Sequence, residues 1–194
     1  LNMRRIIKDD NSEIVIQDLK YIEGNSTNNQ NISKILFKEQ KNFCAYTEEY
    51  IGINDAVDIE HFNPNLKYTP LDSYQNWFMV KHKPNNKKST NWINTILHPT
   101  DANFENRLIY SEGYFFHHPE DLETKNLINL LNLNDEIFVK NRQKYIKRRK
   151  ERINEKGVSN EDYFQEKVDS EIDSIKYLRA IQEEFKIDIW NMIP

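Results

Sequence analysis

The stretch from Val57 to Pro64, which reads VDIEHFNP, decides the fold of this chain. Its first six residues alternate apolar with polar side chains, which predicts a β-strand. Adjacent residues of a strand point to opposite faces, so Glu60 and His61 reach one site only if the strand ends or bends there. Pro64 favours such an end. The stretch therefore predicts a polar site at the end of a strand.

Two more polar clusters follow in order. Asn76 comes 15 positions after His61 and opens the apolar run Asn76-Trp77-Phe78-Met79-Val80. Nine positions later, Asn85 opens Asn85-Asn86-Lys87-Lys88. A strand that ends in an acid–His pair, then a loop, an Asn and a helix that begins with a ligand residue predict a β-hairpin followed by a helix. That arrangement brings Glu60, His61, Asn76 and Asn85 around one cation.

These residue types suit the hydrolysis of a phosphodiester. Neutral His61 is a candidate general base near pH 7, and Asn76 is a candidate for orienting its ring. Carboxylate and amide oxygens are ligands for Mg²⁺ or Mn²⁺, which makes Glu60 and Asn85 the candidate metal ligands. Residue chemistry alone leaves a second interpretation open, because a Glu–His pair at a strand end is often only surface and the chain is rich in Asn.

The composition predicts a helix-dominated, polar protein. The chain has 194 residues, 38% of them hydrophobic and 30% charged, with only 4 Gly and 6 Pro, which disfavours a sandwich or barrel of many turns. Its net charge of −4 provides no general attraction to nucleic acid, so such contact requires local basic patches. The single cysteine, Cys44, excludes an internal disulfide and fits a reduced cytoplasmic setting. The absence of a long apolar run or a signal-peptide pattern leads us to expect no membrane association.

The order of the motifs predicts an α+β fold in which a central ββα motif is embedded in helices. We expect an N-terminal arm and helix in residues 1–40, the core in 41–95, and a hairpin with a helical extension in 96–194. The extension contains a hairpin with Gly113 in its turn, a helix from an N-cap at Asn134 to about Lys156, and a last helix that begins near Ser159. The apolar spacing of that last helix predicts a packing face, made by Phe164, Val168, Ile172, Ile175 and Leu178.

Two groups of cations are candidate phosphate contacts. Four lysines flank the predicted site: Lys81, Lys83, Lys87 and Lys88. A second group of nine crowds one helix between Lys140 and Lys156. For this helix two interpretations stay open, namely contact with phosphates or a solvated face whose charges pair at i,i+4. His117 and His118 are expected to be surface residues.

The central segment resembles the HNH nucleases, whose pattern is an acid–His pair before a proline, an Asn that opens an apolar strand, and a ligand residue followed by Asn and basic residues. Over roughly residues 3 to 150 the chain also resembles the PtuB subunits of Septu-type bacterial antiphage systems, which are found beside some retrons as well. Short stretches carry this narrower resemblance: Arg4 to Lys8, Phe43 to Tyr46, Ile59 to Pro64, Gly113-Tyr114, Leu130 to Asn134, and Arg142.

The resemblance implies a metal-dependent endonuclease subunit of antiphage defence that acts on DNA or RNA and has an ATPase partner (PtuA-like) that binds and restrains it. It assigns the base to His61, its orientation to Asn76, and the metal to Glu60 and Asn85. Many relatives hold a structural zinc with two Cys-x-x-Cys pairs, but the corresponding positions here are Cys44, Thr47, Lys81 and Pro84. We therefore expect no structural zinc, with local packing in its place. The alternative is a catalytically silent, HNH-like binding or scaffold subunit, favoured by the lost cysteines and the acidic balance.

Overall fold

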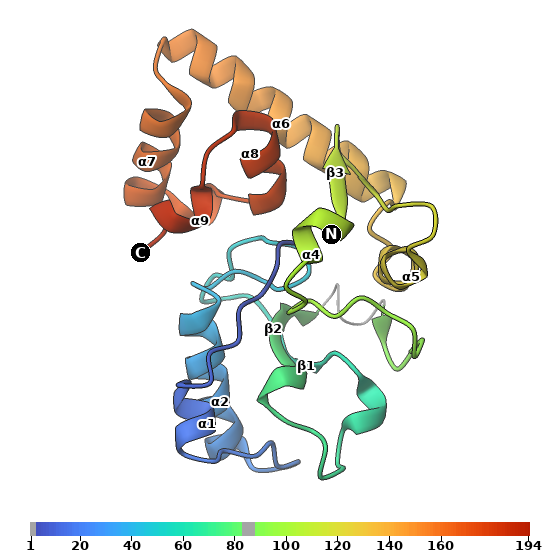
Figure 1. Cartoon of the computed structure of the whole chain (residues 1–194). Coiled ribbons are helices and arrows are strands. Elements are labelled where there is room, and N and C mark those ends of the chain that lie inside the picture. The colour runs from blue at the N-terminus through green and yellow to red at the C-terminus, as the bar shows by residue number, and fades with distance from the viewer. Residues whose placement is uncertain (1–2, 83–87) are drawn as a thin grey trace.

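The chain is α+β, with helices around two small antiparallel sheets (Figure 1). The computed structural model describes residues 3–82 and 88–194. The elements with their bounds are α1 (Glu13–Ile16), α2 (Ser26–Glu39), β1 (Val57–His61), η1 (Pro64–Leu66), η2 (Tyr74–Asn76), β2 (Trp77–Lys81), α4 (Phe104–Arg107), β3 (Ile109–Ser111), β4 (Tyr114–Phe116), α5 (Leu122–Leu130), α6 (Glu136–Lys156), α7 (Asn160–Ser170), η3 (Ile172–Ser174), α8 (Leu178–Phe185) and α9 (Ile189–Met192). Among the described helices, none is long and apolar enough to cross a bilayer.

The strand predicted from residue 57 is β1, which pairs with β2 in an antiparallel hairpin. The register places His61 opposite Trp77 and Glu60 opposite Phe78. The expected helix of a ββα motif would begin after β2, but residues 83–87 lie outside the described part of the chain. The mixed α+β class is therefore established, and the ββα-metal motif stays a prediction.

Strand β2 is buried on both faces, which makes it the centre of the core. Trp77, Phe78 and Val80 are at most 1% exposed. Helix α2 packs against this strand with Ile32 and Leu36, which are fully buried. A strand covered on both sides is expected to be continuously apolar rather than alternating, as this one is.

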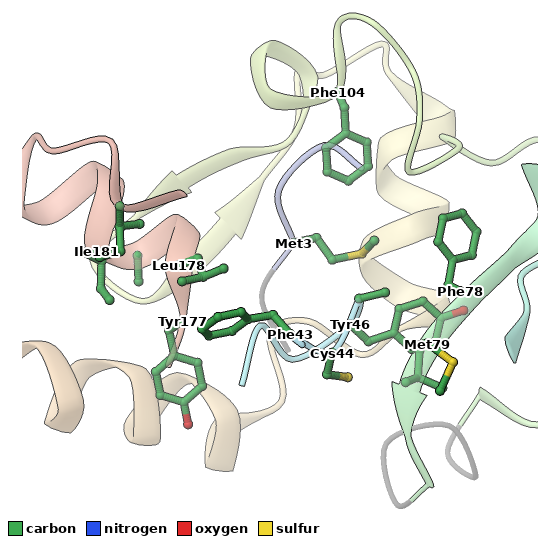
Figure 2. Close-up of a cluster of buried hydrophobic side chains, with 14 of the residues drawn as sticks. Met3, Phe43, Cys44, Tyr46, Phe78, Met79, Phe104, Tyr177, Leu178 and Ile181 are labelled. Carbon is green, nitrogen blue, oxygen red and sulfur yellow. The ribbon is translucent and has the colours of Figure 1, made fainter. Parts of the chain in front are cut away.

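A compact turn of residues 43–50, which we call the knuckle, joins the hairpin to the C-terminal helices. Ala45 donates a backbone hydrogen bond to Met79 in β2, and Tyr177 donates one to Glu48. Figure 2 shows Phe43 and Tyr46 of the knuckle between Phe78 of β2 and the C-terminal segment. These aromatic side chains are buried, as expected if local packing holds the segments together.

The last predicted helix is interrupted. Ser159 caps α7 as expected, by accepting a hydrogen bond from the Asp162 backbone N–H. The helix ends at Ser170, however, and the apolar stripe continues through η3 into α8. Tyr177 adopts a left-handed conformation, with φ 62°, and its N–H binds Glu48 of the knuckle. Phe164, Val168, Ile175 and Leu178 of the predicted stripe are still buried in the core, and Ile172 is partly buried against it.

Helix α6 follows the sequence prediction within one residue. Its N-cap is Asp135 rather than Asn134, because the Asp135 carboxylate accepts the hydrogen bond from the backbone of Ile137. Gly157 ends the helix in the left-handed conformation, as expected for a helix C-terminus. Figure 1 shows α6 as a long helix that runs along one side of the molecule, beside α7 and α8.

Candidate functional site

The end of β1 brings Glu60 and His61 to one place. The strand ends at His61, and the backbone N–H of Phe62 then binds the Asn76 carbonyl at 2.8 Å. Both residues line the same cavity of about 470 Å³, as do Val57, Asp58 and Ile59 before them. The strand ends at this pair as expected, and the convergence of the two side chains on one cation stays a prediction.

His61 is held by a buried carboxylate that the sequence analysis did not select. Its Nε2 lies 3.0 Å from Oδ2 of Asp72, and the two side chains are 5% and 7% exposed. The ring of Tyr21 packs edge-on against the imidazole, with 4.6 Å between ring centroids. Burial lowers the pKa of His61, whereas the Asp72 carboxylate opposes that shift. The imidazole is therefore neutral at pH 7, which is the form that a general base requires.

Asp72 is itself fixed by two hydrogen bonds to its other oxygen. Asn76 Nδ2 donates to Oδ1 of Asp72 at 2.9 Å, and the Trp77 indole N–H donates to the same atom at 2.8 Å. Asn76 thus lies next to Asp72, and Asp72 lies next to His61. The predicted orienting role of Asn76 would act through this carboxylate. The signal available in the sequence was a loop acid four residues before Asn76.

Asn76 also closes the loop between the strands. Its Oδ1 accepts a hydrogen bond from the Asn63 backbone N–H at 2.7 Å, and its Nδ2 donates to the Asn63 carbonyl at 3.1 Å. Because Asn76 is only 4% exposed, these bonds satisfy its polar atoms away from water. The amide therefore sets the path of the chain that follows the candidate base.

Glu60 is buried beside a phenol and an ammonium group. The Tyr46 hydroxyl donates to Oε1 of Glu60 at 3.0 Å, and Nζ of Lys88 lies 2.8 Å from the same oxygen. The Lys88 and Glu60 side chains are 1% and 8% exposed. Burial, followed by the charge of Glu60, raises the pKa of Tyr46 and keeps the phenol protonated. A carboxylate in this setting needs a cation close by, and Lys88 provides one.

The four predicted phosphate-binding lysines are distributed differently from the expectation. Lys88 is buried against Glu60, so its ammonium is not presented to a phosphate. Lys81 points to Asp55 and Glu49, at 3.1 and 3.4 Å. Lys83 and Lys87 lie outside the described residues, as does the candidate ligand Asn85.

Among the residues that the structure describes, the cation that lines the cavity is Lys67, on the loop after η1. Its ammonium lies 5.4 Å from the ring centroid of Tyr21 and 4.9 Å from that of Tyr68. The sequence analysis missed it because a single lysine in a polar loop carries no signal of its own. Lys67 lies beside the cavity only because the fold brings α2 and the loop between the strands together.

Comparison with known proteins gives one partial similarity. Over 71 residues the chain is 44% identical to the CRISPR-associated endonuclease Cas9 of Campylobacter jejuni, which covers 34% of this chain and 7% of that protein. This similarity supports a nuclease-like function. No protein-family model matches the chain, and no solved structure matches it.

Within residues 3–82 and 88–194 no group of three His, Cys, Asp or Glu side chains is placed to hold a metal ion. Two residues with hard carboxylate donors, Asp58 and Glu60, line the cavity, and Glu60 is paired with the Lys88 ammonium at 2.8 Å. Mg²⁺ is bound by one or two carboxylates together with waters and phosphate oxygens, so one protein carboxylate is compatible with it.

Proposed function

We propose that this chain is a metal-dependent endonuclease of the HNH type that hydrolyses nucleic-acid phosphodiesters. The observation that carries the proposal is the placement of Glu60 and His61 on one cavity, with His61 supported by the buried carboxylate of Asp72. The similarity of a third of the chain to an endonuclease supports the same reaction class.

In this proposal His61 is the general base. With Nε2 directed at Asp72, Nδ1 is the atom that takes the proton from the attacking water. Asp72 holds the ring and stabilises the imidazolium that forms, and Asn76 holds Asp72. A positioned base contributes roughly 10²–10⁴-fold to the rate.

Glu60, with Asn85 from the neighbouring segment, would hold Mg²⁺ or Mn²⁺. The cation supplies charge stabilisation for the scissile phosphate and its leaving oxygen. Lys67 lines the same cavity and provides a cationic side chain for a substrate phosphate. We assign Lys88 to a different role, as the counter-charge of the buried Glu60 carboxylate.

The biological setting that we propose is bacterial antiphage defence, with an ATPase partner of the PtuA type. This part of the proposal rests on the resemblance of short stretches along residues 3 to 150 to PtuB subunits. In this proposal the ATPase restrains the nuclease and provides much of the binding to nucleic acid. Such a partner suits a chain with a net charge of −4.

One observation favours a second candidate function, a silent HNH-like binding or scaffold subunit. Because Lys88 neutralises Glu60, the buried carboxylate is stable without a bound cation. A chain that has lost catalysis could retain the hairpin for its packing alone.

A substrate survey separates the two candidates. The purified chain is incubated with plasmid DNA and with total RNA, in Mg²⁺ or EDTA, with and without the ATPase partner. The endonuclease proposal predicts Mg²⁺-dependent cleavage of at least one substrate. The absence of cleavage in every combination would contradict the proposal and favour the scaffold.

A further inference from the structure

The structure sorts the nine cations of α6 into separate groups. Arg142 is fully buried, with its guanidinium on the carbonyls of Gly113 and Leu133. Arg149 is partly buried and donates to Ser174 and Tyr163. Five others pair with carboxylates: Lys140 with Glu136, Lys147 with Glu151, Lys150 with Glu184, Arg152 with Glu155, and Lys156 with Glu166.

Lys144 and Arg148 are the two that remain, and both face a cleft. They are exposed, and within the described part of the chain neither lies within ion-pair distance of a carboxylate. The cleft has a volume of about 880 Å³ and lies between α6 and the segment from Ser174 to Tyr177. Lys176, on the opposite side of the cleft from α6, adds a third cation, whose charge also acts on the Asp55 carboxylate.

The acidic side chains of the cleft are already neutralised. Glu49 pairs with Lys81, Glu151 with Lys147, and Glu155 with Arg152. Five cations and three carboxylates line the cleft, so its net charge is 5 − 3 = +2 in a chain whose net charge is −4. The cleft is therefore a local basic site in an acidic protein, and it attracts anions.

The spacing of the cations selects an extended anion. Lys144, Arg148 and Arg152 follow at intervals of four residues on one face of α6, and Arg152 has further N–H groups beside the one that Glu155 binds. At 1.5 Å per residue they span about 12 Å, which is too long for one phosphate group and suits a chain of phosphates. Guanidinium groups also bind phosphate oxygens in a bidentate geometry.

We infer that this cleft, between α6 and residues 174–177, binds the phosphodiester backbone of a nucleic acid. It is a site separate from the cavity that Glu60 and His61 line, because the two share no residue. The contact is to the backbone and requires no cation at Glu60, so the inference does not rest on the proposed catalysis. The cleft provides part of the attraction to nucleic acid that the acidic chain otherwise lacks.

The test is binding of short fluorescein-labelled DNA and RNA, single-stranded and double-stranded, by fluorescence anisotropy in EDTA. The full chain is compared with the cleft variant K144A/R148A/K176A. A control, K140A/K156A/K186A, removes the same charge from three exposed lysines outside the cleft. Because all six substitutions lie at the surface or at a cleft rim, circular dichroism is expected to show unchanged folding.

The inference predicts that the cleft variant weakens binding about 10-fold or more and makes the dependence on salt shallower by about 2–3 in the logarithmic slope. The control should change the affinity less than about threefold. Equal losses of affinity in the two variants would show that the effect comes from net charge and not from the cleft. A parent protein that binds no nucleic acid would exclude the site. Either result overturns the inference. Because binding is measured in EDTA, where the proposed metal-dependent reaction does not run, loss of catalysis and loss of the cleft give different results.

Discussion

The described part of the chain contains two antiparallel hairpins that differ in what they bury. His61 ends the first strand of one, and His117 and His118 follow the second strand of the other. The β1–β2 hairpin encloses His61, Glu60 and Asn76, all at most 6% exposed. The β3–β4 hairpin is exposed on one face, and His118 after it faces solvent. Burying polar groups costs free energy unless they are paired, and in the first hairpin His61 lies against Asp72 while Glu60 is paired with Tyr46 and Lys88.

The two hairpins also differ in which residues fix the segment that joins their strands. Strands β3 and β4 are joined by the short turn Glu112–Gly113, whose carbonyls accept hydrogen bonds from Gln143 and Arg142 of α6. Strands β1 and β2 are joined by the loop that carries Asp72, which is fixed by side chains of the hairpin itself. One hairpin is tied to a helix as a structural element, while the other orders its own loop around a histidine.

The largest effect that we expect from this contrast is on catalysis. His61→Ala should lower cleavage by roughly 10²–10⁴-fold, the usual contribution of a positioned general base. His118→Ala, the matched change at the other hairpin, should leave the rate unchanged. Initial rates on the substrate identified in the survey provide the measurement. Equal activity of the His61→Ala protein and the parent would remove the distinction between the two hairpins.

The next largest effect is on stability and concerns the structural hairpin. Arg142→Met should destabilise the fold by about 3 kcal/mol, because the carbonyls of Gly113 and Leu133 lose their buried donor. Lys147→Ala, an exposed change on the same helix, should stay within about 0.5 kcal/mol. Urea unfolding monitored by circular dichroism measures both. Similar stabilities for the two variants would show that Arg142 does not anchor the turn.

A stability change of similar size is expected at the polar hairpin, with a different response to metal. Lys88→Met leaves the Glu60 carboxylate buried without its ammonium partner, which should cost about 3 kcal/mol. Mn²⁺ should raise the thermal midpoint of this variant more than that of the parent, because the cation replaces the missing charge. A Lys88→Met protein that is as stable as the parent, or insensitive to Mn²⁺, would contradict the assigned role of Lys88.

The smallest effect is expected at Asp72. Asp72→Asn should lower the rate by about 10–100-fold, the usual loss when a residue that orients an active group is changed. The Asp72 carboxylate stabilises the imidazolium, so its removal lowers the pKa of His61 further. The acidic limb of the pH–rate profile should therefore move to lower pH. A slower enzyme with an unmoved profile would indicate a purely structural role for Asp72.

Local sequence patterns predicted the elements of the fold but not the contacts between them. The alternation in β1, the Gly113 turn and the Ser159 cap depend on neighbouring residues, and each was correctly predicted. Helix α7 ends earlier than predicted, at Ser170, and the segment after it is joined to the knuckle by the bond from Tyr177 to Glu48, which lies far away in the sequence. No local pattern reports such a contact.

The same division applies to the candidate site. Glu60 and His61 were selected because they are adjacent and end a predicted strand, and their role in a site stays a prediction. Asp72 and Lys67 were missed, since their relation to His61 arises only when the loop folds back. Lys88 was expected to contact phosphate, but its burial against Glu60 depends on a carboxylate 28 positions earlier in the chain.

The most direct test of the central claim, that the β1–β2 hairpin is a metal-dependent catalytic centre, is a Mn²⁺ titration of cleavage by the parent and by Glu60→Gln. We predict that parental activity rises to saturation with Mn²⁺ and disappears in EDTA. The Glu60→Gln protein should need at least about 10-fold more Mn²⁺ or lose activity altogether, because its only described carboxylate ligand is gone. Superimposable titrations of the two proteins, or cleavage that persists in EDTA, would contradict the account.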